Sequence, residues 1–538
     1  MEMKKQKKII GGMILVLAVT ACASFFKSAA EEIAQEETSE IYQNEIKTIY
    51  TEAYQDEVET QIEEEKSSGA YTEDNMLIKE NPYGTNTLSL YVYFTTQEPV
   101  SVSYNVSVPD LSIGDFSQTP EGEGRFDTEH EFQVMGLIPE ECNTITFTLT
   151  KEDGSVEIYS YVHEMGELSG KEEIQLKQTE AAEGSETVSD GLYVVLGNDS
   201  DEEDFMYYYD NSGVLRGEIP LIGYRSHRLL FRDDCMYYSI SESKIAAVNH
   251  LGKAEKIYDT GTYSLHHDYV FDDDGNLLVL ATDTESDSVE DQIIQINTQT
   301  GEVSCVLDLG ELFSDYKEEC TENEDGELDW IHINTIQWIG DDAVLLSSRE
   351  TSTILMIEDI YDTPQITYMI GEESFWEGTG YEELLLEKDE SAGTFSNTGG
   401  QHSVTYVQDD SLNAGEYYLY LFNNDTGVSK SRPDLDWGQM GILEEQKKEA
   451  KSYYYKYLVD ENSGTFCMKE SFELPVSEYG GSVQKTGENV VYASGDSGSF
   501  GEYDKDHRLI GGYQMDSETR IYRVYKYDFE GFYFTDDK

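Results

Sequence analysis

Histidine is scarce in this chain, and four of its nine histidines lie in three short segments of the second half. The segments are HHDYVFDDDGNLLVL (266–280), DWIHINTIQWIGDDAVLLSSR (329–349) and GGQHS (399–403). Imidazole can act as a nucleophile, a proton carrier or a metal ligand, so histidines gathered from distant segments indicate an active site. Each segment joins turn residues to strand formers, which is typical of repeat folds that aim one residue per unit at a common axis.

The middle segment predicts a hairpin with a polar face. His332 and Asn334 alternate with two isoleucines, so a strand would place the polar pair on one face, toward a wet cavity. The alternative is a strand whose polar face lies on the protein surface. Arg349 ends the second strand of the hairpin and would lie beside the start of the first. In so acidic a chain, the alternative for this arginine is simple pairing with a carboxylate.

The other two segments supply further candidates. His402 follows two glycines, which permit a tight bend and a close backbone approach, so its ring would be well exposed to a reactant. An ordinary loop histidine is the alternative. His266 and His267 are adjacent, and in a regular strand they would face opposite ways. We therefore expect only one of them at the axis and favour His267.

Composition and charge narrow the functional classes. The 538 residues are 38% hydrophobic, enough for a packed core, and the 40 tyrosines and 20 phenylalanines favour strands. The 36 basic and 109 acidic residues give a formal charge of −73, which argues against nucleic acid and against adsorption to an anionic membrane. An anionic substrate would therefore need a locally positive site.

The N-terminus predicts export. Lysines precede an apolar stretch at 9–20 that is too short to span a bilayer. Residues 1–22 therefore read as a signal peptide, and their last four residues, VTAC, match a lipoprotein box. Cys22 would then carry the lipid. Ordinary cleavage after 21–23 is the alternative. We expect a protein at the cell surface or in the periplasm, anchored as a lipoprotein, with no other membrane span.

The rest of the chain divides into four parts. Residues 23–78 are charged and helical, and we expect a spacer helix that docks on the next domain. Residues 79–180 alternate like a small β-sandwich of immunoglobulin or fibronectin type, and 181–190 read as a linker. The predicted helix has an apolar stripe that recurs every four residues: Tyr42, Ile46, Tyr50, Tyr54, Val58 and Ile62.

Residues 191–538 predict an all-β domain, a β-propeller. Hairpin signals recur loosely, but the units are too degenerate for the residues alone to fix the number of blades. The strongest helix signal in this part is ILEEQKKEAKSYYYKYL (442–458). The hairpin signals lie at 207–219, 246–258, 271–282, 293–309, 418–431 and 497–513.

Taken together, the three histidine segments closely resemble the bacterial aryl-sulfate sulfotransferases that use no nucleotide sulfate donor. The resemblance covers essentially all of the exported chain, including the N-terminal strand domain. It implies a six-bladed propeller with a site in the central channel, a homodimer, and a histidine that is transiently sulfated. Carried over by motif, His402 is the nucleophile and Arg349 clamps the sulfuryl oxygens. His332 and His267 complete the catalytic set, with His266 and Asn334 as substrate-binding residues.

The resemblance implies ping-pong transfer of a sulfuryl group from a phenolic sulfate ester to a second phenol, without metal or cofactor. One feature departs from better-known periplasmic members, which carry a disulfide near the catalytic loop. Here no cysteine lies between Cys320 and Cys467, so that loop must be held otherwise. A disulfide framework is not expected, and Cys305 with Cys320 is the only near pair.

Two other functions stay open. Three axial histidines could hold zinc and make the propeller a metal-dependent hydrolase or lyase. The propeller could also be a non-catalytic surface-binding module in which the histidines are incidental.

Overall fold

A computed structural model describes residues 43–109, 111–170, 175–182, 187–197, 205–324, 326–444, 451–516 and 520–535. The predicted signal peptide and Cys22 lie outside this part. Among the described residues, no helix combines the length and the apolar composition that a membrane span requires. All five cysteines after Cys22 are free thiols, Cys305 and Cys320 included.

The N-terminal domain is built around one long strand. The first half of β2 (Leu90–Ser107) pairs with β1 (Leu77–Glu80) and β4 (Asp127–Val134), and its second half pairs with the remaining strands. Because the strand passes from one layer to the other, the two layers close over a shared apolar core and form the predicted β-sandwich. The strands that pair with the second half of β2 are β3 (Phe116–Gln118) and β5 (Cys142–Lys151). The last strand, β6 (Val156–Glu164), pairs with β5.

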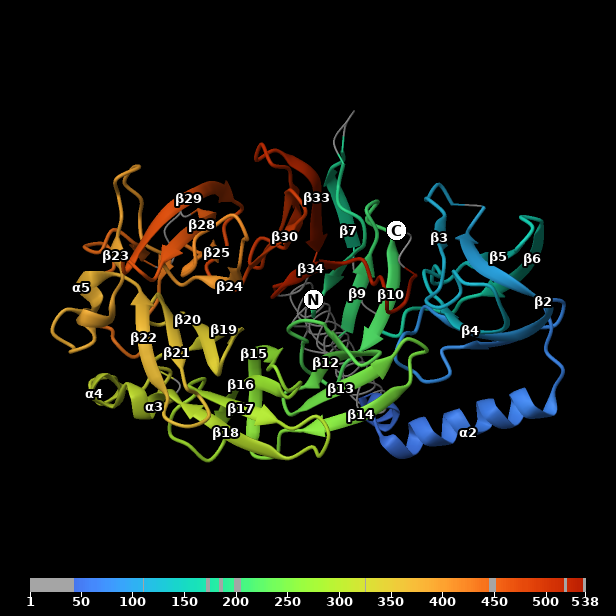
Figure 1. The fold of residues 1–538 in the computed structure, drawn as a ribbon, viewed down its shortest axis with the longest axis horizontal. Helices are drawn as coiled ribbons and strands as arrows, with labels where there is room; N and C mark the ends of the chain where they lie inside the picture. Colours follow the sequence, from blue (N-terminus) through green and yellow to red (C-terminus); the bar gives the residue numbers. More distant parts are fainter. Residues whose placement is uncertain are drawn as a thin grey trace, which may run out of the picture.

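Six sheets follow, antiparallel except for one short parallel edge strand, and surround a common centre, so the domain is a six-bladed β-propeller (Figure 1). From the inside outward, blade 1 is β34 (Val524–Tyr527), β8 (Leu192–Val195), β9 (Phe205–Tyr209) and β10 (Leu215–Pro220). Blade 2 is β11 (Leu230–Arg232), β12 (Cys235–Ser241), β13 (Lys244–Asn249) and β14 (Ala254–Asp259). Blade 3 is β15 (Tyr263–Phe271), β16 (Leu277–Asp283), β17 (Gln292–Ile296) and β18 (Val303–Asp308).

Blade 4 is β19 (Ile333–Gly340), β20 (Ala343–Ser348), β21 (Thr353–Glu358) and β22 (Gln365–Ile370). Blade 5 is β24 (His402–Val407), β25 (Glu416–Asn423), β28 (Ser452–Asp460), β29 (Thr465–Leu474) and the short β23 (Glu387–Lys388). Blade 6 is β30 (Ser482–Thr486), β31 (Asn489–Ser494), β32 (Ser499–Tyr503), β33 (Leu509–Asp516) and β7 (Gln175–Glu180). Short elements between them are α3 (Leu309–Leu312), α4 (Ser314–Lys317), α5 (Glu373–Trp376), η1 (Glu382–Leu384), β26 (Thr426–Gly427) and β27 (Leu443–Glu444).

Both ends of the propeller sequence close the ring. The C-terminal strand β34 is the innermost strand of blade 1, next to β8, although more than 300 residues separate them. At the other end, β7 adds an outer strand to blade 6 by pairing with β33. The sandwich boundary that we drew at residue 180 therefore runs too far, because β7 belongs to a propeller sheet.

Five of the six hairpin signals are hairpins in the structure. They do not fall one per blade, since blade 3 holds two of them and blade 4 holds none. The signal at 418–431 ends β25, and β26 then pairs with β27 in parallel. Of the helix predicted at 442–458, residues 445–450 lie outside the described part. The rest of the prediction is wrong, because β28 occupies 452–460 as a central strand of blade 5, where its tyrosines pack on neighbouring strands.

A helix, α2 (Glu52–Ser68), lies where we expected the spacer helix, and helical residues 43–49 precede it. It docks on both domains. The buried Gln55 amide donates to the carbonyl of Tyr83 in the N-terminal domain and accepts from the amide N–H of Ala254 in blade 2. The Tyr50 hydroxyl donates to the carbonyl of Pro220 in blade 1. This helix therefore fixes the sandwich against the propeller.

The seam between blades 1 and 6 generates a first prediction. Lys526 of β34 and Glu502 of β32 form an ion pair of 3.0 Å in which both side chains are fully buried. Lys526→Met leaves a buried carboxylate without its cation, so the free energy of unfolding should fall by about 3–5 kcal/mol. Urea denaturation of the full chain measures this loss.

The matched control is Lys505→Met, because Lys505 pairs with Asp506 at the exposed surface. It should cost less than about 1 kcal/mol. Adding Glu502→Gln to Lys526→Met should restore part of the lost stability by removing the stranded charge. Equal losses in the two lysine variants would show that the buried pair does not secure the seam.

Candidate active site

The inner strands bring residues of five blades to the propeller axis. His332 lies just before β19, His402 begins β24, and Arg523 lies just before β34. The ring centroid of His267 in β15 lies 4.8 Å from the ring centroid of His332. It lies 6.5 Å from that of His227, which precedes β11. The three histidine segments of the sequence therefore meet at one site, as predicted.

The neighbours of His402 determine which of its nitrogens carries the proton. Asn424 Nδ2 donates to the carbonyls of Ser477 and Gly480, at 2.9 and 2.8 Å, which leaves its Oδ1 as an acceptor. This oxygen lies 2.9 Å from His402 Nδ1, so Nδ1 must carry the hydrogen. The lone pair of a neutral His402 is then on Nε2, free to attack.

The surroundings also keep His402 neutral. The residue is only 2% exposed, so the expectation of a well-exposed ring is wrong. Burial lowers the pKa of His402 to about 3; the Asn424 bond opposes this shift, while the charges of Arg349, His332 and Arg523 add to it. At any pH near neutrality the ring is therefore an uncharged base.

The loop that carries His402 is held by a polar clamp. The amide N–H of Gly400 donates to Ser352 Oγ at 3.0 Å, and the Asn334 amide donates to the Gln401 carbonyl at 2.8 Å. Gly400 has φ +59, and a Cβ there would lie 2.6 Å from the Thr426 carbonyl oxygen, so the close approach that we expected is present. Gln401 Nε2 lies within hydrogen-bonding distance of three acceptors in blade 4: Ser347 Oγ, the Ser348 carbonyl and the Thr353 carbonyl.

Asn334 was expected to bind substrate. In the structure it is fully buried and its Nδ2 holds the Gln401 carbonyl, so it positions the residue that precedes His402. His332 has φ +46, in the left-handed region, and the strand starts one residue later than the alternation suggested. Both residues are buried toward the axis, so the surface-strand alternative is wrong.

Two carboxylates face His332. Its Nδ1 lies 3.0 Å from Asp329 and 2.5 Å from Glu290. Burial and the charge of Arg349 oppose protonation, but the two carboxylates outweigh them and raise the pKa of His332 to about 9. His332 and His402 therefore have opposite protonation states at neutral pH, one charged and one neutral.

Arg349 follows β20, and its amide N–H donates to the His332 carbonyl, as the hairpin predicted. Its Nη2 contacts Asp329 at 3.0 Å and Glu350 at 2.7 Å. Arg349 therefore pairs with carboxylates, as the alternative reading expected, but both partners are buried and do not lie on the surface. The Nε of Arg349 is buried and has no hydrogen-bond partner in the described part of the chain, so this edge of the guanidinium can bind an anion.

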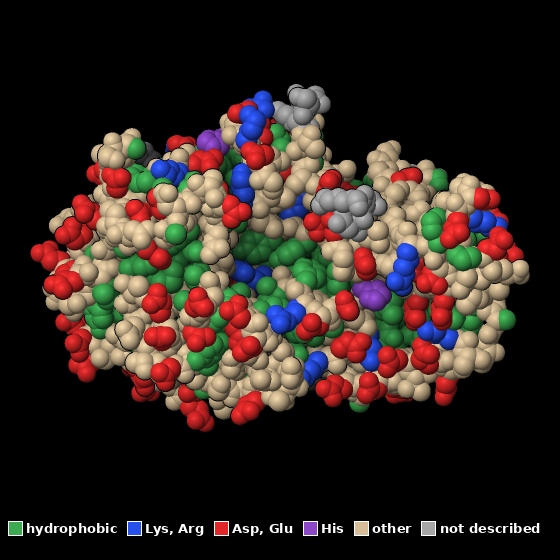
Figure 2. All heavy atoms as spheres, viewed as in Figure 1, with side chains coloured by type: hydrophobic (Ala, Val, Ile, Leu, Met, Phe, Trp, Pro, Cys, Tyr) green, Lys and Arg blue, Asp and Glu red, His purple; other side chains and the backbone are tan. Residues whose placement is uncertain are grey.

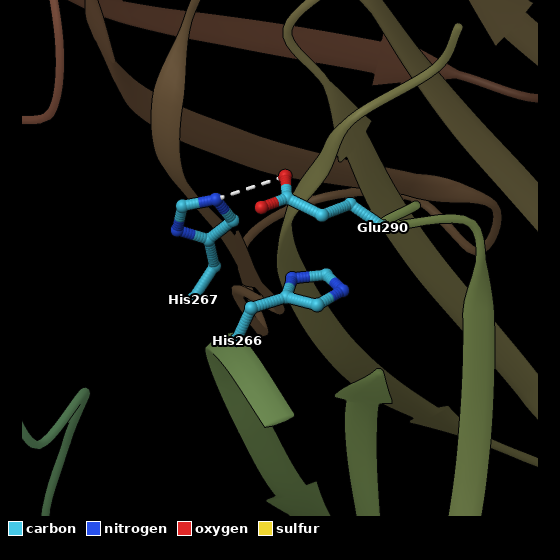
Figure 3. A group of neighbouring side chains, drawn as sticks. All are labelled: His266, His267 and Glu290. Atoms are coloured by element: carbon cyan, nitrogen blue, oxygen red, sulfur yellow. Dashed lines mark hydrogen bonds and ion pairs between the residues drawn. The ribbon is translucent and has the colours of Figure 1, made fainter. Parts of the chain in front are cut away.

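The expectation that only one of His266 and His267 could reach the site is wrong. The β15–β16 register shifts between Leu265 and Tyr269, and His267 has φ +52. This bulge breaks the strand alternation. Both rings then lie beside the carboxylate of Glu290 (Figure 3).

Sequence reasoning missed several residues of the site. The Tyr522 ring packs against the rings of His227, His267 and His402, and Arg225 lies over it at 4.2 Å. The segment YRSHR (224–228) was a findable signal, because it combines two arginines with one of the few histidines. Nothing in the sequence marked the others, which are Glu290, Glu350, Asn424, Tyr522 and Arg523.

The site combines charges of both signs in a strongly acidic protein. Red carboxylates cover much of the outer surface, whereas blue basic and green apolar side chains line the hollow at the middle of the same face (Figure 2). At the axis, four arginines stand against four carboxylates, and protonated His332 adds one positive charge. A locally positive site was expected. In the structure most cations of the site are paired with carboxylates, and the charge that remains is positive.

Two overlapping groups of side chains could hold a metal ion. One is His266, His267 and Glu290, and the other is Glu290, Asp329 and His332. In each group the possible ligand atoms all lie within 4.8 Å of one another.

Comparison with known families assigns both domains. Residues 177–528 match the arylsulfotransferase (ASST) model, and residues 77–166 match the arylsulfotransferase Ig-like domain. The chain belongs to the arylsulfotransferase family. The predicted resemblance is confirmed, and family membership supports a sulfotransferase that acts on small molecules.

Solved structures add little to this assignment. One similar structure is a candidate 6-phosphogluconolactonase from Bacteroides uniformis ATCC 8492, with 11% identity, TM-score 0.34, and 80% and 99% of the two chains covered. Another is an auxiliary nutrient binding protein from Bacteroides thetaiotaomicron VPI-5482, with 9% identity, TM-score 0.30, and 82% and 98% covered. No curated protein matches the chain.

The Asn424 hydrogen bond generates the second prediction. Asn424→Ala removes the acceptor that keeps the proton of His402 on Nδ1, so the reactive tautomer loses its preference. Turnover of an aryl sulfate should fall by about 10–100-fold, and the thermal melting temperature should fall moderately without loss of the fold, because the Ser477 and Gly480 carbonyls also lose their donor. Asn462→Ala, at an exposed asparagine, is the control. Unchanged turnover in Asn424→Ala would show that this amide does not set the tautomer.

Proposed function

We propose that this sulfotransferase moves a sulfuryl group from a phenolic sulfate ester to a second phenol through a sulfo-histidine at His402. The observation that supports this most is the state of His402: buried, neutral, and tied at Nδ1 so that Nε2 has a free lone pair. Neutral imidazole needs no prior deprotonation to attack sulfur. Arg349 and His332 supply positive charge nearby.

In the first half-reaction, the Nε2 lone pair of His402 attacks sulfur. A nitrogen–sulfur bond forms while the bond from sulfur to the aryl oxygen breaks, and the phenolate leaves with that electron pair. Such transfers have loose transition states with charge on the equatorial oxygens, so fixed cationic donors are the main means of catalysis. The Nε of Arg349, which has no hydrogen-bond partner among the described residues, is suited to these oxygens, and the charge of His332 lies nearby.

In the second half-reaction, the oxygen of an acceptor phenol attacks the sulfur, and the nitrogen–sulfur bond breaks back to His402. The acceptor loses one proton, which balances the proton that the released phenolate takes up. The product is a new aryl sulfate and the free enzyme. Because one histidine serves donor and acceptor in turn, the kinetics should be ping-pong.

The cellular setting is a separate proposal. We propose that the protein is exported and anchored through lipid on Cys22, because the first 22 residues combine a basic start, a short apolar stretch and a lipoprotein box. A homodimer remains the expectation from the family resemblance.

The third prediction tests the covalent step. His402→Ala should lower turnover of phenyl sulfate by at least about 10³-fold with the fold intact, as expected when a nucleophile is removed. Intact-mass spectrometry after a brief mix with aryl sulfate should show one added sulfuryl group on the wild type and none on the variant. His163→Ala, at a histidine of the sandwich edge, is the control.

Steady-state kinetics complete this test. Parallel double-reciprocal lines for donor and acceptor are expected. Intersecting lines, or a sulfuryl group that maps to a tyrosine or serine, would remove His402 from the covalent role.

The fourth prediction concerns Arg349. A lysine offers one hydrated point charge and cannot reproduce a planar fork. Arg349→Lys should therefore slow both half-reactions, each by the equivalent of about 2–4 kcal/mol, the range for losing one oxyanion donor. Stopped-flow phenol release measures the first half-reaction, and acceptor-dependent loss of the sulfo-enzyme measures the second.

Arg508→Lys is the control, because this exposed arginine pairs with Asp504 far from the axis. It should change neither rate. A normal burst rate in Arg349→Lys with a lowered melting temperature would assign Arg349 to stability alone, through its buried carboxylate partners.

A further inference from the structure

The wall of the site opposite the proposed nucleophile is a cluster of ligand-type side chains, which we name the Glu290 cluster: His266, His267, Glu290, Asp329 and His332. Its members come from blade 3 and the start of blade 4. His267, Glu290 and His332 all have φ between 46° and 56°, in the left-handed region. Non-glycine residues adopt this conformation only where the surroundings impose it, and such residues gather at functional sites.

The possible ligand atoms of His266, His267 and Glu290 all lie within 4.8 Å of one another, and His332 adjoins this group through His267. His267 Nε2 lies 3.2 Å from Glu290 Oε2 and 3.0 Å from His332 Nε2. A tetrahedral zinc with bonds of about 2.0 Å holds its ligand atoms about 3.3 Å apart. Figure 3 shows that the rings of His266 and His267 both lie close to the Glu290 carboxylate.

Buried nitrogen atoms provide a second, independent observation. Neither ring nitrogen of His266 makes a well-aligned hydrogen bond with a residue that the structure describes, although the Ala281 backbone lies near the ring, and Nδ1 of His267 has no partner there either. The two residues are only 5% and 7% exposed. Buried polar atoms without partners are rare and costly, so the poorly satisfied imidazole of His266 beside this carboxylate indicates a position for a ligand.

Asp329 contacts the side of the His332 ring that faces away from His267. It holds Nδ1 of His332 at 3.0 Å, while the other ring nitrogen of His332 faces His267. A carboxylate behind a metal-binding imidazole fixes the ring and makes it a stronger ligand. Several imidazoles with one carboxylate select zinc and related transition metals over calcium or magnesium, which prefer oxygen ligands alone.

We propose that His266, His267 and Glu290, with His332 as the fourth ligand, bind one divalent transition-metal ion such as Zn²⁺, and that this ion and the substrate's sulfuryl group exclude each other. The exclusion rests on the proposed function, because His267 and His332 would serve both. Metal binding itself does not depend on it, and it displaces the proton that His332 carries at neutral pH. Zinc would thus act as an inhibitor of sulfuryl transfer.

The fifth prediction measures zinc binding directly. The full chain, stripped with chelator, is titrated with ZnCl₂ by isothermal calorimetry. One tight site should stand out above weak binding to surface carboxylates. Glu290→Gln should weaken that site by at least about 100-fold, the upper range for losing a metal-site residue. His266→Asn is a second variant with the same expectation, and thermal melts confirm that both variants fold.

The matched control is Glu129→Gln, in an acidic surface pocket shared with Glu121, Glu131 and Asp234. It should leave the tight site unchanged. Equal zinc affinity in Glu290→Gln and Glu129→Gln, or no tight site in the wild type, would overturn the proposal.

The exclusion is tested in His402→Ala, which cannot react. Phenyl sulfate binding to this variant is measured by calorimetry with and without saturating Zn²⁺, and zinc should weaken it at least about tenfold. Unchanged binding would overturn the exclusion. Zinc-stimulated turnover in the wild type would overturn it too and favour a metal-assisted reaction. A tight zinc site in a protein without phenyl-sulfate turnover would count against the proposed function and leave the metal site standing.

Discussion

A single buried carboxylate, that of Asp268, holds the centre of the propeller together. It is fully buried in blade 3 and pairs with Arg228 at 2.7 Å, next to β11, and with Arg523 at 3.3 Å, next to β34. Its other oxygen accepts from the amide N–H of Ile336 in blade 4. One carboxylate thus joins four blades. A buried charge is tolerated only with such partners, so the ring must close with the C-terminal strand in place before the axis is satisfied.

The same rule explains how a chain of charge −73 can present an anion site. Unpaired buried arginines would be too costly to desolvate, and Arg228, Arg349 and Arg523 each pair with a carboxylate near the axis. Arg349 is the example. Its Nη2 contacts Asp329 and Glu350, whereas its Nε has no hydrogen-bond partner among the described residues. The pairing fixes the guanidinium and leaves part of its donor set for a ligand, so the site is preorganised without a large net charge.

The sequence predicted the fold class and the convergence of the three histidine segments, because strand alternation, turn chemistry and motif order are local signals. It could not predict that His266 and His267 both reach the site, since that depends on a bulge imposed by the tertiary contacts of β15. The role of Asn424 could not be predicted either, because it depends on the atoms that its amide contacts in the folded chain. The tyrosine-rich β28 was read as a helix from its flanking charges, and pairing on both sides overrides that propensity.

The absence of a disulfide at the catalytic loop has a structural consequence. A disulfide would hold the loop locally, whatever the blades did. Here the loop before His402 is held by Asn334, Ser352 and the acceptors of Gln401, all in blade 4, whereas His402 itself begins the inner strand of blade 5. The position of the nucleophile is therefore set across a blade interface. Since that interface is tied through Ile336 to Asp268, correct placement of His402 is coupled to closure of the whole ring.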